Sequence, residues 1–223
     1  MIFENKIFNS LEYVEAYRED FDKTKKHPLF IHFHGSGTRN TRLDVVKKTE
    51  LFDGVEKSGY DFVTVAPLFR YDSWFDCFET VRAFIVDLSK RDYIDEDRIY
   101  LLGTSMGAYC AWQLAMSMPE YFAALAPICG GGMYWNAKRL INIPVWAFHG
   151  ELDRVVFPEE SKKLVDAINK KGGNAKLTLY PDCQHAAWEP TFRNPELYSW
   201  LISNSRKKKD TASDDFNDAK KFG

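Results

Sequence analysis

Short apolar runs alternate with longer amphipathic segments along most of the chain. The runs are rich in β-branched and aromatic residues, and they fall at 29–33, 62–66, 98–102, 123–127, 145–148 and 176–180. Apolar residues at helical spacing mark the segments at 44–57, 74–91, 105–117, 159–171 and 195–203. Because strands that alternate with helices pair in parallel, this order predicts an α/β fold in which helices cover both faces of a mostly parallel sheet.

The length of the chain predicts one domain followed by a tail. The 223 residues suffice for one hydrophobic core and are too few for two domains joined by a linker. We place that domain at residues 1–204. Residues 205–223 begin with a basic run and continue with polar and acidic residues, among which only Phe216 and Phe222 are large and apolar. This composition predicts a flexible charged tail.

Charge and cysteine content argue against several functions. The 30 basic residues nearly balance the 32 acidic ones, so the chain lacks the basic field that nucleic-acid binding needs. The four cysteines are spread out, with no C-x-x-C and no pairing with a histidine at metal-ligand spacing, which predicts free thiols and no metal site. The first residues lack the apolar run of a signal peptide, and no stretch reaches the roughly 18 apolar residues of a membrane span. We therefore expect a cytoplasmic protein without nucleic-acid or membrane partners.

The strongest chemical motif is Gly-Thr-Ser-Met-Gly at 103–107. It follows a predicted strand and opens a predicted helix. Small residues at Gly103 and Gly107 permit a tight turn that exposes the hydroxyl of Ser105. The motif alone occurs by chance, and an ordinary turn with a capping serine is the alternative. Its position between strand and helix favours a nucleophile.

A serine nucleophile needs a base within hydrogen-bond reach and an acid that orients the base. The chain offers Asp153 after the predicted strand at 145–148 and His185 after the strand at 176–180. Two other acids lie nearby. Glu151 comes too early in its turn, and Asp182 is tethered only three residues before His185. Ser105, Asp153 and His185 are therefore the predicted catalytic residues.

Four motifs in order resemble the α/β-hydrolase fold. They are His34-Gly35-Ser36-Gly37, the motif around Ser105, His149-Gly150-x-x-Asp153, and Tyr180-Pro181 followed by His185. The chain is similar to single-domain serine esterases related to the prolyl oligopeptidases, dienelactone hydrolases and feruloyl esterases. The order serine, aspartate, histidine is the order of that fold. The cysteine nucleophile of dienelactone hydrolases proper is absent.

The resemblance also implies an oxyanion hole made by backbone N–H groups. One donor is the residue after the nucleophile, Met106, and the other comes from the loop after an early strand, here Ser36. Relatives often have a second glycine where this chain has Asn40, so the turn after Ser36 is expected to differ. His34 and His149 lack neighbours that would complete a metal site, and we expect structural roles for them.

Four aromatic residues fall in or beside loops that follow predicted strands, where open α/β sheets bind ligands. We predict that they line the substrate site; they are Trp74, Trp135, Phe157 and Trp188. Half-buried packing is the alternative for each. Residues 128–144, the usual place of a lid, are too few for a substantial one.

These features together predict a serine hydrolase of small-molecule carboxylic esters that works through an acyl-enzyme and needs no cofactor. A small serine peptidase is one alternative, because the same triad cleaves amides. A non-catalytic binding protein on the hydrolase fold is another. The sequence predicts neither the acyl group nor the alcohol of the substrate, and it gives no oligomeric state.

Overall fold

The structure is a computed structural model that describes residues 1–206, and it contains one eight-stranded sheet over that part of the chain. The strand order is β1-β2-β4-β3-β5-β6-β7-β8. Strands β3 to β8 pair in parallel, and all are strands that the sequence predicts. Their bounds are β3 (His27–Phe33), β4 (Val63–Leu68), β5 (Ile94–Thr104), β6 (Ala124–Ile128), β7 (Val145–Gly150) and β8 (Ala175–Tyr180). The predicted fold class is confirmed.

An N-terminal hairpin that the sequence analysis did not predict extends the sheet. Strand β1 (Ile2–Phe8) pairs antiparallel with β2 (Leu11–Tyr17), which pairs antiparallel with β4. Asn9 and Ser10 both have positive φ, 42° and 69°, as a two-residue hairpin turn requires. The hairpin places β1 at one edge of the sheet and leaves β8 at the other.

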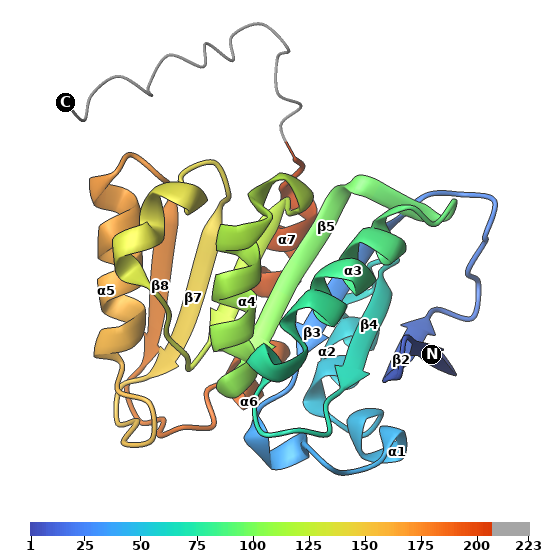
Figure 1. The fold of residues 1–223 in the computed structure, drawn as a ribbon, viewed down its shortest axis with the longest axis horizontal. Coiled ribbons are helices and arrows are strands. Elements are labelled where there is room, and N and C mark those ends of the chain that lie inside the picture. Colours follow the sequence, from blue (N-terminus) through green and yellow to red (C-terminus); the bar gives the residue numbers. More distant parts are fainter. Residues whose placement is uncertain (207–223) are drawn as a thin grey trace, which may run out of the picture.

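Helices cover both faces of the sheet (Figure 1). In that view α3 (Phe78–Ser89), α4 (Met106–Ser117) and α5 (Glu159–Lys170) lie in front of the sheet, and α2 (Glu50–Ser58), α6 (Trp188–Arg193) and α7 (Pro195–Ser203) lie behind it. The remaining short elements are η1 (Ser36–Thr38), α1 (Leu43–Val46), η2 (Trp74–Cys77), η3 (Pro119–Tyr121) and η4 (Tyr134–Leu140). The segments predicted as single helices at 44–57 and 74–91 are each broken, into α1 and α2 and into η2 and α3.

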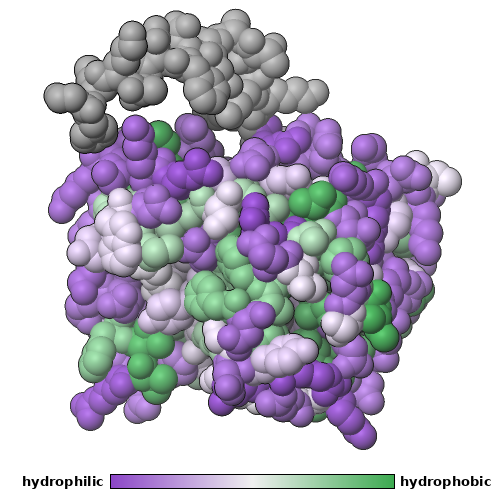
Figure 2. Space-filling view, viewed as in Figure 1, coloured by the Kyte–Doolittle hydropathy of each residue, from purple (hydrophilic) through white to green (hydrophobic). Residues whose placement is uncertain are grey.

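Each face of the sheet has its own hydrophobic core. Trp112 and Leu164 belong to the core under α3 to α5, and Phe52 and Leu197 belong to the core under α2, α6 and α7. Burial on both faces explains why the parallel strands are nearly continuous apolar runs. Figure 2 shows the α3–α5 face, where green hydrophobic residues appear among purple hydrophilic ones in its middle and lower parts.

The domain extends slightly beyond its predicted end. Arg206, predicted to lie in the tail, donates from its backbone N–H to Asp97 O at 2.8 Å and from its guanidinium to Glu120 O at 2.7 Å. Ser205 Oγ also donates to Asp97 O. The rest of the predicted tail lies outside the described residues. Within residues 1–206 no helix has the length and apolar character needed to cross a bilayer, and the four cysteines are free.

Candidate active site

Ser105 occupies a strained turn between β5 and α4. Its φ of 53° and ψ of −119° fall in a region that residues with a side chain rarely adopt. The two glycines of the motif allow the turn to pack closely: a Cβ at Gly103 would lie 2.2 Å from Gly107 O, and a Cβ at Gly107 would lie 2.0 Å from Phe33 O. The turn therefore needs glycine at both positions.

A continuous chain of hydrogen bonds joins the three predicted catalytic side chains. The Ser105 hydroxyl lies 2.9 Å from His185 Nε2, and His185 Nδ1 lies 2.7 Å from Asp153 Oδ2. These residues follow β5, β7 and β8, whose carboxyl ends point to the bottom of Figure 1. The parallel sheet thus gathers residues that are up to 80 positions apart in sequence.

Asp153 is held as a carboxylate although it is only 2% exposed. Its Oδ1 accepts hydrogen bonds from the backbone N–H groups of Val155 at 2.8 Å and Val156 at 3.0 Å. Burial by itself would raise the pKa of Asp153, but the hydrogen bond from His185 and the two backbone donors outweigh burial and lower it. The rival acids Glu151 and Asp182 are exposed, and neither is hydrogen-bonded to His185 within residues 1–206.

The two predicted oxyanion donors lie beside the serine. Met106 is the first residue of α4 and Ser36 the first of η1, and within residues 1–206 neither backbone N–H donates to a protein acceptor. The η1 loop passes close to Ser105, since a Cβ at Gly35 would lie 3.3 Å from Ser105 Cβ and 3.9 Å from its Oγ. Neither N–H group is therefore committed to another backbone group within residues 1–206.

Two residues stabilise the η1 loop. His34 donates from Nδ1 to Gly35 O at 2.7 Å and accepts at Nε2 from the backbone N–H of Phe69 at 3.0 Å. Burial lowers the pKa of His34 to about 4, so the ring is neutral, as this pairing requires. Asn40 has a φ of 58°, a conformation that asparagine tolerates better than most residues. Asparagine can therefore occupy this turn.

The prediction that Trp74 lines the substrate site is wrong. Its side chain is fully buried, it stacks on Phe69 at a centroid distance of 4.8 Å, and its Nε1 donates to His34 O at 3.0 Å. The loop after β4 folds back onto the core, which a sequence pattern does not reveal. Trp74 therefore supports the loop that carries Ser36.

The other three predicted aromatic residues are accessible. Trp188 is half-buried and meets the His185 ring edge-on at 5.7 Å, while Trp135 and Phe157 are 67% and 61% exposed. Further exposed apolar side chains that sequence reasoning missed occupy the same set of loops after β4, β6 and β7; they are Tyr71, Phe75, Tyr134, Leu152 and Val155. Their position in the sequence directly after strand ends is the signal from which these residues could have been predicted.

The segment between β6 and β7 is short. It contains η4 and no longer helix. His149, for which we expected a structural role, is fully buried near the end of β7 and lies against Asp153. Within the described residues, no group of three His, Cys, Asp or Glu side chains could hold a metal ion.

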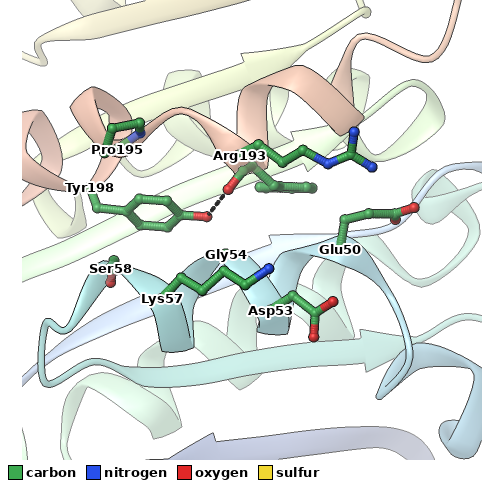
Figure 3. A pocket seen from close by; sticks show the side chains of 9 residues that line it. Glu50, Asp53, Gly54, Lys57, Ser58, Arg193, Pro195 and Tyr198 are labelled. Carbon is green, nitrogen blue, oxygen red and sulfur yellow. Dashed lines mark hydrogen bonds between the residues drawn. The ribbon is translucent and has the colours of Figure 1, made fainter.

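A separate cavity of about 360 Å³ lies on the other face of the sheet, between α2 and the α6–α7 corner. The Tyr198 hydroxyl donates to the Phe192 carbonyl at 2.7 Å, and Figure 3 shows Tyr198 opposite Lys57 and Asp53 of α2. None of the predicted site residues lines this cavity. It is therefore distinct from the site around Ser105.

Fold and site together define an α/β hydrolase. The chain matches the dienelactone hydrolase family over residues 76–221 and belongs to that family. It is similar to a thermostable esterase of known structure, with 32% identity and a TM-score of 0.79, over 92% of this chain and 63% of that one.

Two curated relatives are longer proteins. Dipeptidyl-peptidase 5 of Porphyromonas gingivalis is 22% identical over 77% of this chain and 32% of its own length. The bifunctional acetylxylan esterase/xylanase XynS20E of Neocallimastix patriciarum is 33% identical over 52% of this chain and 17% of its own length. The chain thus spans about a third or less of these relatives.

Proposed function

We propose that this chain is a serine esterase that hydrolyses a carboxylic ester through Ser105, His185 and Asp153. The observation that carries the proposal is the hydrogen-bonded chain from Ser105 Oγ to Asp153 Oδ2, with distances of 2.9 and 2.7 Å, on a strained strand-to-helix turn. The similarity to a thermostable esterase supports an ester as the substrate.

In the first half-reaction, Ser105 Oγ attacks the ester carbonyl carbon while His185 Nε2 takes the hydroxyl proton. The carbonyl oxygen becomes an oxyanion that accepts hydrogen bonds from the backbone N–H groups of Met106 and Ser36. Asp153 stabilises the imidazolium. When the tetrahedral intermediate collapses, the C–O bond to the alcohol breaks and His185 returns the proton to the leaving oxygen.

Water completes the cycle. His185 Nε2 takes a proton from a water molecule, the hydroxide oxygen bonds to the acyl carbon, and the bond to Ser105 Oγ breaks. The serine recovers its proton from His185, and the carboxylic acid leaves. All steps use groups of the chain and water.

The exposed aromatic side chains near the site favour an ester with an apolar or planar part. Trp188 already contacts the ring of His185, and Trp135 and Phe157 stand on loops at the same edge of the sheet. Aromatic faces offer large apolar contact area at a small entropy cost. We assign the three side chains to substrate binding.

A small peptidase is the second candidate, because one relative is a dipeptidyl-peptidase and the same triad can cleave an amide. We favour the ester because the esterase of known structure is 32% identical to this chain, against 22% for the peptidase.

A substrate panel separates the two candidates. It contains p-nitrophenyl, feruloyl and acetyl-sugar esters beside aminoacyl p-nitroanilides, with Ser105→Ala as the blank. We expect kcat/KM for the best ester to exceed that for the best amide by at least about 100-fold. Faster cleavage of the amides would replace the esterase proposal with the peptidase.

A further inference from the structure

A second histidine lies against the carboxylate of Asp153. His149 is fully buried near the end of β7, and its Nε2 is 3.2 Å from Asp153 Oδ2. The same oxygen accepts from His185 Nδ1 at 2.7 Å. Two imidazoles therefore share one carboxylate oxygen, one on the substrate side and one on the protein side.

The partners of His149 determine where its proton sits. Nε2 is also 2.9 Å from Val156 O, and because neither this carbonyl nor the carboxylate can donate, Nε2 must carry the hydrogen. Nδ1 lies 2.8 Å from the hydroxyl of Ser161, a buried residue of α5. Burial lowers the pKa of His149, which favours the neutral ring with Nδ1 as an acceptor. The Ser161 hydroxyl has two acceptors within reach, His149 Nδ1 and Gly130 O at 3.1 Å, and its single hydrogen is shared between them.

The contacts around Asp153 form a closed ring. Val156 donates its N–H to Asp153 Oδ1 at 3.0 Å, and its carbonyl accepts from His149, which in turn reaches Asp153 Oδ2. A carboxylate whose Oδ1 is held by two fixed backbone donors loses its freedom to rotate. Its Oδ2 oxygen then stays directed at His185.

We infer that His149 is a positioning residue for Asp153: its Nε2–H holds the carbonyl of Val156, and the N–H of Val156 holds Asp153 Oδ1, so that Oδ2 stays in the orientation from which it accepts the hydrogen bond of His185. The inference rests on the proposed function. His149, the histidine of the His-Gly-x-x-Asp motif, would thus act on the reaction through Asp153 and without contact with the substrate.

The test compares three substitutions of His149 in ester hydrolysis. His149→Phe removes the donor, His149→Asn keeps an amide too short to reach Val156 O, and His149→Gln places an amide N–H near the position of Nε2. We expect the Phe and Asn variants to lose about tenfold to a hundredfold in kcat, because a misdirected Asp153 weakens its hydrogen bond with His185, a bond to a charged group, with KM within about twofold of wild type. The Gln variant should stay within about threefold of wild type in kcat.

His27 provides a matched control at the opposite end of the sheet. It is 3% exposed, it lies at the start of β3, and it also bridges a carboxylate and a carbonyl, Asp61 Oδ2 at 2.7 Å and Asp22 O at 2.8 Å. His27→Phe should lower the melting temperature and leave kcat unchanged. A general loss of stability is thereby separated from a loss of positioning.

Three outcomes decide the matter. If His149→Phe does not fold, the Asn and Gln pair carries the test, and equal kcat in these two variants overturns the inference. If wild type is active, Ser105→Ala is inactive and His149→Phe keeps kcat within twofold, the inference fails and the proposed function stands. If wild type neither hydrolyses esters nor reacts with a fluorophosphonate, the proposed function fails and the inference falls with it.

Discussion

Among residues 1–206 two carboxylates are buried, Glu15 in the N-terminal hairpin and Asp153 at the carboxyl edge of the parallel sheet. Glu15 is fully buried and pairs with two cations, Lys6 at 2.6 Å and Arg91, and it accepts from the Tyr93 hydroxyl at 3.0 Å. Its charge is already neutralised by fixed partners. Such an arrangement holds the hairpin to the rest of the sheet and leaves no charge to use elsewhere.

Asp153 is surrounded differently. Within residues 1–206 its partners are two backbone N–H groups and two imidazoles, and no lysine or arginine pairs with it. Its negative charge is stabilised by hydrogen bonds and is not cancelled. It can therefore stabilise a positive charge that appears on His185 only during the reaction. The contrast teaches that the partners of a buried carboxylate, more than its burial, separate a structural role from a chemical one.

The largest expected effect comes from removing the nucleophile at the edge that holds Asp153. Ser105→Ala should lower kcat for ester hydrolysis by a factor on the order of 10⁶, as loss of a triad serine does. The fold should be retained, because alanine keeps the packing of the turn. Initial rates beside a melting curve check this, and an undiminished rate would remove Ser105 from the mechanism.

Neutralising Asp153 tests the functional half of the comparison. Asp153→Asn should lower kcat by a factor on the order of 10⁴, because an amide favours the wrong imidazole tautomer and cannot stabilise the imidazolium. The neighbouring changes Glu151→Gln and Asp182→Asn serve as controls and should cost about tenfold or less. A crippling Asp182→Asn with a mild Asp153→Asn would reverse the assignment of the acid.

Neutralising Glu15 tests the structural half. Glu15→Gln leaves Lys6 and Arg91 without their shared anion, and we expect a loss of about 3 kcal/mol in the free energy of unfolding, since breaking a buried ion pair is costly. The values of kcat and KM should equal those of wild type. Denaturant titration and steady-state kinetics measure the two effects, and a fall in kcat without a fall in stability would contradict the contrast.

Acid should act first on the carboxyl edge of the sheet. Burial lowers the pKa of His34 to about 4 and that of His32 to about 3, whereas an unfolded histidine titrates near 6.5. Between these values the unfolded chain binds more protons, so stability is complete above about pH 6.5 and falls as the pH drops toward 4.

The His34 contribution can be isolated. At pH 5, protonation of His34 in the unfolded chain should lower the free energy of unfolding by about 2 kcal/mol relative to neutral pH, from about 1.4 kcal/mol per pH unit. His34→Gln should therefore flatten the dependence of unfolding free energy on pH between 7 and 5. An unchanged slope would show that His34 is not buried in its neutral form.

The parts of the fold that follow local patterns were predictable from the sequence. Strands β3 to β8 are apolar because both faces are covered, and α7 has the bounds that its spacing predicted. The hairpin was missed because Glu15 interrupts the apolar pattern of β2 and becomes compatible with burial through Lys6, Tyr93 and Arg91, of which Arg91 is 76 residues away. Such a long-range partner leaves no local signal.

The site residues also fall into those that local motifs predict and those that depend on long-range packing. Ser105, Asp153 and His185 could be selected because each lies in a motif at the end of a strand. Trp74 was assigned wrongly, since its burial depends on how the loop after β4 folds back onto the core. The contact between His149 and Asp153 was missed because a spacing of four residues in a turn does not reveal where two side chains meet.

The most direct test of the central claim is reaction of the folded wild-type protein with a fluorophosphonate, followed by intact mass and peptide mapping. An activated serine should form one stoichiometric adduct, located on Ser105, while Ser105→Ala forms none and His185→Gln reacts at least about 100-fold more slowly for lack of the general base. Folded protein that forms no adduct, or forms it on another residue, would contradict the account.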